Sequence, residues 1–140
     1  MGSKRPRMSI FFAILSVAYI AGIFLFAGSP IVSAVNSYNP YSLLHIPLYG
    51  ILSLFIALSI ITFRVPYSNR PNKWMSPPIE AVSLSITRLL ISGSIATGVG
   101  IADEIYQSFL PNRSASLIDV LLDFLGTTLA LLFILQRYKK

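Results

Sequence analysis

The sequence predicts an all-α protein, a bundle of four transmembrane helices with both chain termini in the cytoplasm. The first indication is composition: of 140 residues, 54% are hydrophobic and 11% are charged, and the mean hydropathy is +0.71. A soluble domain of this length has too little interior to hide that much apolar surface. The second is four apolar segments of about 20 residues, the length that crosses about 30 Å of hydrocarbon. The third is the distribution of basic residues.

The apolar segments are separated by turn chemistry. Asn39-Pro40 and Ser76-Pro77-Pro78 each combine a helix cap with proline in the first turn, and they precede the second and third segments. Leu110-Pro111-Asn112 breaks the chain between the third and the fourth. No repeat or separate soluble part interrupts the pattern, so residues 1–140 are expected to form one membrane domain. Its helices are expected at about residues 8–28, 43–63, 83–109 and 117–135.

The basic residues predict the orientation. Only Arg113 lies in the first or third connection. By the positive-inside rule, the chain ends and the second connection are therefore cytoplasmic, and the protein is a multi-pass protein of the plasma membrane. The net charge of +6 flanks apolar segments and does not indicate nucleic acid, so the lipid bilayer is the expected partner. The other ten basic residues are Lys4, Arg5, Arg7, Arg64, Arg70, Lys73, Arg88, Arg137, Lys139 and Lys140.

The first segment has a second interpretation, as a cleaved signal peptide. Val32-Ser33-Ala34 resembles a cleavage site, and the basic residues before the segment resemble an n-region. The apolar run, however, is longer than the ~7–15 residues of a signal-peptide core. We therefore expect the segment to remain as a helix, while cleavage would leave three spans and the same outer connections.

Ionisable residues gather at the outer end of the predicted bundle. Arg88 and Arg137 are expected near the inner interface, where long side chains reach water. A rise of about 1.5 Å per residue places Asp103 and Asp123 about 22 and 21 Å from these anchors, and His45 lies farther out. These groups are thus expected within the outer leaflet or at its edge.

Helical spacing also places these residues on three faces that converge. Charges that face lipid are costly, so the three faces should point toward one another or toward a water-filled cavity. The third helix adds a stripe of small residues that would let a neighbouring backbone approach, formed by Gly93, Ser94, Thr97 and Gly98. The converging faces are His45, Tyr49 and Leu52 on the second helix, Asp103, Glu104 and Gln107 on the third, and Asp119, Asp123 and Gly126 on the fourth.

Each polar residue has a simpler interpretation when it is taken alone. Asp119 suits a helix cap, and Glu104 suits interfacial water. Arg113 could anchor the protein at lipid headgroups or form a salt bridge. His45 could be a neutral histidine that is hydrogen-bonded to the backbone, and Tyr49 could belong to the belt of aromatic residues at the membrane interface. Together these interpretations must explain several ionisable groups from three helices at one depth. We therefore favour a functional site.

The segment Asp103–Arg113, followed by Ser116, Asp119 and Gly126, resembles the VanZ-like family. The family pattern is an acidic pair, a glutamine, a proline-bounded turn and an arginine, then an aspartate and a glycine on the last helix. His45-Ile46-Pro47-Leu48-Tyr49-Gly50 is similar to its second-helix motif. The resemblance covers most of residues 43–135. It implies a protein of the cell envelope, because the family is named for a membrane protein that raises resistance to the antibiotic teicoplanin.

Two departures make the outer site more acidic than the family pattern. Ser42 stands where a lysine is frequent, and Asp123 stands where an asparagine is frequent. Four carboxylates then face the single guanidinium of Arg113 and leave three formal negative charges in excess. Crowded carboxylates in a low dielectric cannot all stay ionised. We expect Asp119 or Asp123 to be protonated near neutral pH, or a divalent metal or substrate amine to neutralise the cluster.

Three functions of different classes remain open. The protein binds or modifies an envelope component, such as a lipid-linked cell-wall precursor; or it is an intramembrane enzyme; or the polar residues form a structural lock that helps other membrane proteins assemble. Transport is less favoured, because four helices would have to oligomerise to form a path. The candidate substrate-binding residues are His45, Tyr49, Asp103, Glu104, Gln107, Arg113, Asp119 and Asp123.

The chemistry of an enzyme would be acid–base or metal-assisted. With no cysteine and no G-x-S-x-G motif, the sequence offers no thiol nucleophile and no serine nucleophile elbow. A lone histidine makes zinc less favoured than oxygen-bound metals, and we assign no metal ligands and no cofactor from the sequence. The candidate catalytic residues are His45, Glu104, Asp119 and Asp123.

Overall fold

The computed structural model describes residues 5–30, 43–61, 79–111 and 113–139, and all regular structure in these parts is helical. This confirms the predicted all-α class with four helices. The predicted turns at residues 39–40 and 76–78, the cleavage motif at 32–34, and Asn112 lie outside the described residues. The helices are α1 (Arg5–Phe26), α3 (His45–Ile61), α4 (Ile79–Gln107) and α5 (Leu117–Lys139).

The helix bounds differ from the predicted ones at several ends. α1 stops at Phe26, before Ser29-Pro30, because the residue before a proline is disfavoured in a helix. α4 begins at Ile79 rather than at about residue 83. Its start directly follows Pro77-Pro78 in the sequence, and proline favours a helix start because its fixed φ suits the first turn. α5 begins as predicted at Leu117 but continues to Lys139.

Three helices contain stretches long and apolar enough to cross a membrane, namely Met8–Phe26, Ile86–Gln107 and Leu117–Arg137. Of the predicted second span, at 43–63, residues 62 and 63 lie outside the described residues, and α3 has 17 residues over a length of about 26 Å. Residues 43 and 44 form a turn instead, in which the Ile46 N–H donates to the carbonyl of Leu43 at 3.2 Å. Pro47 lies in the first turn of α3, where a missing N–H costs nothing.

Large apolar side chains cover the outside of the described helices. Leu25, Phe109 and Leu117 are 78%, 80% and 76% exposed. In water such a surface would drive aggregation, whereas lipid is a solvent for it. The three apolar stretches and this surface indicate a membrane protein.

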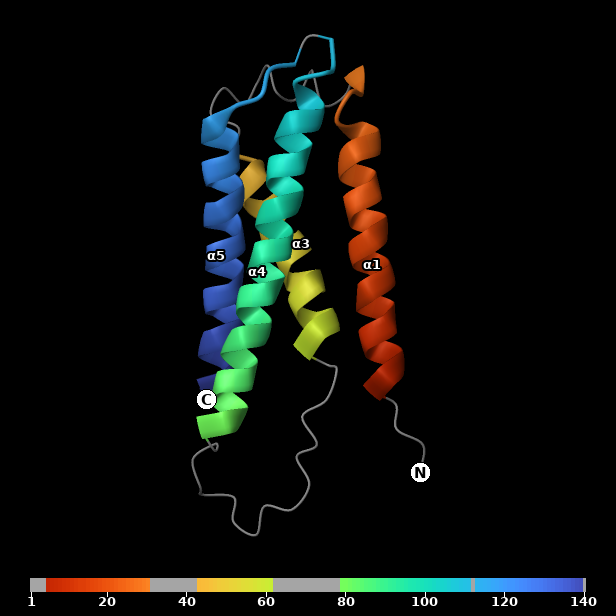
Figure 1. Cartoon of the computed structure of the whole chain (residues 1–140). Helices are drawn as coiled ribbons and strands as arrows, with labels where there is room; N and C mark the ends of the chain where they lie inside the picture. Colours follow the sequence, from red (N-terminus) through yellow and green to blue (C-terminus); the bar gives the residue numbers. More distant parts are fainter. Residues whose placement is uncertain (1–4, 31–42, 62–78, 112, 140) are drawn as a thin grey trace.

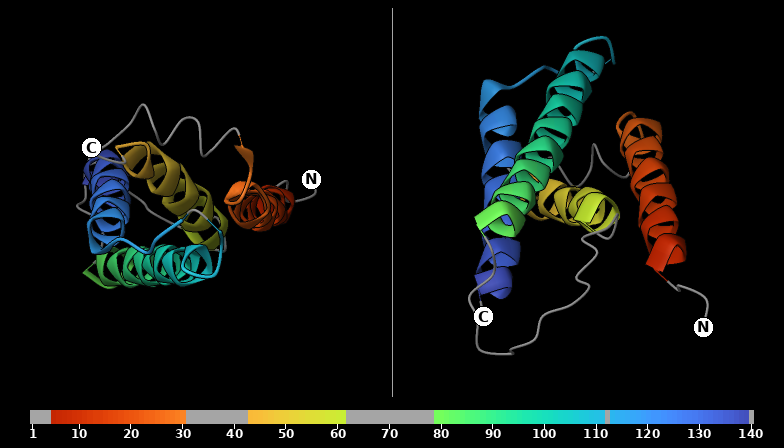
Figure 2. Two further views of the ribbon diagram at one scale, coloured as in Figure 1. Left: turned by 90° about the horizontal axis from the view of Figure 1, so that it is seen from above. Right: turned by 60° about the horizontal axis from the view of Figure 1, so that its bottom comes forward.

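α3 lies at the centre of the molecule and crosses the other helices obliquely (Figures 1 and 2). α4 and α5 pack beside it, and α1 packs on its outer side. Two side-chain bonds hold α1: Ser9 Oγ donates to the carbonyl of Ser59 at 2.9 Å, and Tyr19 OH donates to that of Leu48 at 3.1 Å. Such bonds matter because lipid weakens the hydrophobic drive between helices.

The backbones of α3 and α5 touch at two glycines. A Cβ on Gly50 would lie 3.3 Å from the carbonyl oxygen of Gly126. A Cβ on Gly126 would overlap the carbonyl group of Ile46. This approach holds the first turn of α3, which carries His45, directly against α5.

The two ends of the bundle are different. α1 begins and α5 ends at one end of the molecule (Figure 1), as an even number of antiparallel passes requires. The start of α3, the end of α4 and the start of α5 meet at the opposite end (Figure 1). The predicted site residues of all three helices therefore lie at this second end.

Candidate functional site

One compact group of polar side chains lies where α3, α4 and α5 meet. Its members come from the three faces that the helical spacing predicted. Five of them are almost fully buried, and the side chains of His45 and Asp119 are each 13% exposed. We call this group the polar cluster, which consists of His45, Tyr49, Asp103, Glu104, Gln107, Asp119 and Asp123.

His45 is oriented by Asp123. The imidazole Nδ1 lies 2.7 Å from Asp123 Oδ1, and the Asp123 side chain is 1% exposed. When Asp123 is ionised its carboxylate can only accept, and in that state Nδ1 donates this bond and the lone pair is left on Nε2. Nε2 lies 3.9 Å from Asp119 Oδ2, too far for a hydrogen bond. The interpretation of His45 as bonded to backbone is therefore wrong.

Asp103 is held by two donors at one oxygen. Tyr49 OH donates to Oδ2 at 3.2 Å, and Gln107 Nε2 donates to the same atom at 2.9 Å. Asp103 Oδ1 is buried and has no hydrogen-bond partner among the described residues. Tyr49 is fully buried and stacks on His45, with ring centroids 6.2 Å apart, so it does not belong to an aromatic belt.

Glu104 caps α5 from α4. The Ser116 N–H donates to Glu104 Oε2 at 2.7 Å, while the Asp119 N–H donates to Ser116 Oγ at 3.3 Å. In a capping box the Asp119 side chain would accept the Ser116 N–H, but Glu104 has taken that place. The carboxylate of Asp119 is therefore not a cap and faces His45 instead. Glu104 Oε1 is buried and has no partner among the described residues, so Glu104 does not face interfacial water.

Arg113 lies beside the cluster without an ion pair. The salt bridge that Arg113 was expected to form as one alternative is absent among the described residues. Its Nε is buried there and has no hydrogen-bond partner. The side chain is half-buried, close enough to Asp103 for the two charges to attract each other. The guanidinium is therefore available to a bound group.

Three side chains of the cluster can offer ligand atoms to one ion. One atom each from His45, Glu104 and Asp119 lies within 4.8 Å of the other two. The cluster can also exchange protons, because the Nε2 lone pair of His45 is free to accept one. Both kinds of chemistry were left open by the sequence.

Two residues of the site were not found from the sequence. Gly100 makes room for Asp123, since a Cβ on Gly100 would lie 2.7 Å from Asp123 Oδ2. Thr127 is 2% exposed, and its Oγ1 has no partner among the described residues. Spacing could have found both: Gly100 lies three residues before Asp103, and Thr127 lies one turn after Asp123.

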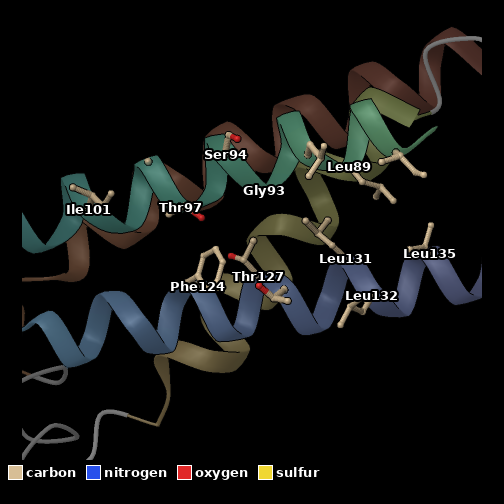
Figure 3. A pocket seen from close by; sticks show the side chains of 14 residues that line it. Leu89, Gly93, Ser94, Thr97, Ile101, Phe124, Thr127, Leu131, Leu132 and Leu135 are labelled. Atoms are coloured by element: carbon tan, nitrogen blue, oxygen red, sulfur yellow. The ribbon is translucent and has the colours of Figure 1, made fainter. Parts of the chain in front are cut away.

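A groove of about 540 Å³ runs between α4 and α5 next to the cluster (Figure 3). Thr127 projects from α5 into the space between the two helices (Figure 3). The prediction that the small residues on α4 let a neighbouring helix backbone approach is wrong for the described chain. Gly98 has no neighbour within 4 Å, and the nearest atom to a Cβ on Gly93 would be a methyl of Leu131 at 2.9 Å. These small residues line the groove and do not receive a helix backbone.

No family model matches the chain, and neither a curated protein nor a solved structure does.

Proposed function

We propose that this protein is a VanZ-like integral protein of the plasma membrane that binds the headgroup of a lipid-linked envelope molecule in the polar cluster. Both chain ends are proposed to be cytoplasmic. The orientation is supported by the separation of charge along the bundle. Arg137 lies near the end of α5 where the chain terminates, and the cluster lies at the opposite end. The positive-inside rule then directs the cluster to the outer leaflet.

The observation that carries the proposal is a set of buried polar atoms that have no hydrogen-bond partner in the described part of the chain. A purely structural lock would satisfy its members, because each buried polar group left unpaired costs about 1–3 kcal/mol. Native proteins contain few such atoms, and each one calls for an explanation. A bound headgroup would supply the missing partners. The atoms are Asp103 Oδ1, Glu104 Oε1, Arg113 Nε, Asp123 Oδ2 and Thr127 Oγ1.

The charge of the cluster limits the headgroup. The carboxylates outnumber the guanidinium by three, and the site is largely shielded from water. Desolvated like charges repel strongly, so a purely anionic group would not enter alone. The headgroup must carry an amine or arrive with a cation, and Arg113 can hold a phosphate or carboxylate at the edge of the site.

The groove between α4 and α5 suits the hydrocarbon chain of the same molecule. Its volume of about 540 Å³ lies within the ~300–1,000 Å³ of typical ligand pockets. No residue of the polar cluster lines the groove, but Thr127 in its wall lies one turn from Asp123 on the same face of α5. A molecule with a polar head and a long apolar chain would fill both.

An enzyme is the second candidate, and the pairing of His45 with Asp123 favours it. A carboxylate that holds Nδ1–H fixes the tautomer in which Nε2 can accept a proton, as in acid–base catalysis. Purified protein that cleaves or transfers the headgroup of a lipid-linked cell-wall precursor would support this candidate. A precursor that is bound and recovered unchanged would leave binding as the function.

The proposal is tested by lipid retention. The full chain is purified from vesicles that contain phosphatidylglycerol, cardiolipin and a polyprenyl-diphosphate-linked cell-wall precursor, and the lipids that remain bound are measured by native mass spectrometry. We expect Glu104→Gln and Asp119→Asn to reduce retention of the precursor at least tenfold. The matched control is Ser108→Ala, in the turn that directly follows α4, because the Ser108 side chain is exposed and its hydroxyl donates to the carbonyl of Ile105, outside the polar cluster. Equal retention by all four chains would overturn the proposal.

Teicoplanin susceptibility in a sensitive Gram-positive host tests the envelope role. We expect expression of the chain to raise resistance. Asp119→Asn and Asp123→Asn should abolish this effect at normal membrane abundance. Loss of abundance in both variants would favour the structural lock. No resistance from the unmodified chain would overturn the link to teicoplanin.

A further inference from the structure

We infer that His45, Glu104 and Asp119 form a binding site for a divalent metal ion, in which Asp123 orients the histidine. The ion would be a second ligand of the polar cluster, in addition to the lipid headgroup proposed above. The inference rests on the proposed function only in that the two share the polar cluster.

The ligand atoms are spaced as they would be around one ion. Two ligands about 2.1 Å from a metal are about 3.0 to 4.2 Å apart, depending on the angle between them. His45 Nε2 and Asp119 Oδ2 are 3.9 Å apart, inside that range. All three ligand atoms lie within 4.8 Å of one another, so a small rotation of the carboxylates completes the set.

His45 is already prepared as a ligand. A metal-bound histidine nearly always donates its other ring N–H to a carboxylate or carbonyl, which fixes the tautomer and the direction of the lone pair. Asp123 makes this bond to Nδ1 at 2.7 Å. Gly100 of α4 leaves space for the Asp123 side chain of α5, so the orienting carboxylate can pack closely against α4.

Glu104 gives independent evidence for a missing ligand. One of its oxygens is fixed by the Ser116 N–H at 2.7 Å, and the other has no partner among the described residues although the side chain is 4% exposed. A buried, unpaired carboxylate oxygen is costly unless something binds it. This oxygen belongs to the residue that completes the three-ligand set with His45 and Asp119. A cation is the partner that the surrounding negative charge favours.

The donors indicate the class of ion. One imidazole with two carboxylates suits Mn²⁺ or Zn²⁺, whereas Ca²⁺ and Mg²⁺ prefer oxygen ligands only, so this donor set reverses the preference for oxygen-bound metals that the sequence suggested. Three protein ligands leave coordination positions open for water or for an oxygen of a bound headgroup. The ion would also offset two of the excess negative charges of the cluster.

Metal binding is measured on the purified full chain in detergent without added lipid, after removal of metals by a chelator. Mn²⁺ binding is followed by electron paramagnetic resonance, and Co²⁺ is used as an optical probe that competes with Zn²⁺. We expect one ion per chain. Glu104→Gln and Asp119→Asn should each weaken binding at least tenfold, and Asp123→Asn should weaken it roughly tenfold to hundredfold.

Asp103→Asn is the matched control. It removes a carboxylate from the same cluster but not from the three ligands, so its effect should be clearly smaller than that of either ligand variant. Absence of a stoichiometric ion from the unmodified chain would overturn the inference. It would also fail if Asp103→Asn weakened binding as much as Glu104→Gln. Where Glu104→Gln does not fold, Asp119→Asn and the imidazole signature in the Co²⁺ spectrum decide the question.

The two proposals can fail separately. An ion that binds to a chain retaining no precursor lipid would overturn the proposed function and support the metal site. A precursor that is retained equally with and without chelator, on a chain that binds no ion, would do the reverse.

Discussion

Replacement of Gly126 by alanine is expected to force α3 away from α5. A Cβ at this position would overlap the carbonyl oxygen of Ile46 and lie 2.8 and 2.9 Å from its carbonyl carbon and Cα. Ordinary contacts of a Cβ are 3.4–4 Å, so the carbonyl oxygen of Ile46 must move by more than an ångström. The obstructing atoms are backbone, and no side-chain rotation can relieve them.

The magnitude follows from two opposing effects. Overpacking costs about 1–3 kcal/mol, and the contact with several backbone atoms places this site at the upper end. Alanine regains up to about 1 kcal/mol over glycine in a helix. The net loss in the free energy of unfolding is therefore about 2 kcal/mol, or roughly a thirtyfold change in the equilibrium constant.

The assay is reversible unfolding of the purified chain in mixed micelles, titrated with a denaturing detergent and followed by helical circular dichroism. Gly98→Ala is the control, because a Cβ on Gly98 would have no atom within 4 Å. It should be neutral or slightly stabilising. Equal stability of Gly126→Ala and Gly98→Ala would refute the close contact between α3 and α5. A second readout is metal affinity, which should fall in Gly126→Ala because His45 directly precedes the displaced Ile46.

Three further substitutions test single contacts of the site. Gly100→Ala should weaken metal binding about tenfold at normal abundance, because the new methyl pushes the Asp123 carboxylate away from His45. Unchanged metal affinity would contradict the role of Gly100 in making room for Asp123. Tyr49→Phe removes one of the two donors to the buried carboxylate of Asp103 and should lower the free energy of unfolding by about 1–3 kcal/mol. Detergent titration measures this loss, and Mn²⁺ binding should show an unchanged metal affinity. Ser116→Ala removes the hydroxyl that caps α5 and should lower the free energy of unfolding by about 0.5–2 kcal/mol in the same titration. Metal affinity should be preserved, because the backbone N–H of residue 116 still donates to Glu104. A large loss of metal affinity would argue against that bond.

Much of the site could be predicted from residue spacing. Asp103, Glu104 and Gln107 fall on one face of any regular helix, and the structure buries all three. The same reasoning placed Asp119 and Asp123 on the inner face of the last helix. It succeeds because a charged side chain in lipid is so costly that only an inward direction remains.

The partners within the cluster could not be predicted. Spacing alone does not distinguish Asp119 from Asp123 as the partner of His45, because the choice depends on how far α3 slides along α5. That offset is set by the contact of Gly50 and Gly126, which only the packed helices define. The bond from Ser116 to Glu104 was hidden for the same reason, since a capping box within α5 satisfied the local pattern equally well.

The small residues of α4 show where local patterns mislead. Gly93 and Gly98 match a motif for helix association, but they line a groove. Gly100, outside that motif, is approached closely by the Asp123 side chain of α5, whereas the nearest atom to a Cβ on Gly93 would be at the tip of the Leu131 side chain. A motif records which residues are small, and the rotation of the helix decides which of them face a neighbour.

Hydropathy and helical periodicity were enough to determine the number of helices, their approximate ends and the set of residues that share the polar face. These properties depend on local helix geometry and on the cost of placing charge in lipid, and both follow from the amino-acid sequence. The tertiary structure alone decided which atoms meet. It paired His45 with Asp123, left Arg113 without an ion pair among the described residues, and brought one atom each of His45, Glu104 and Asp119 within 4.8 Å of one another. Such contacts depend on shifts of a few ångströms between helices, which are determined by close packing at particular glycines and not by any single segment of the chain.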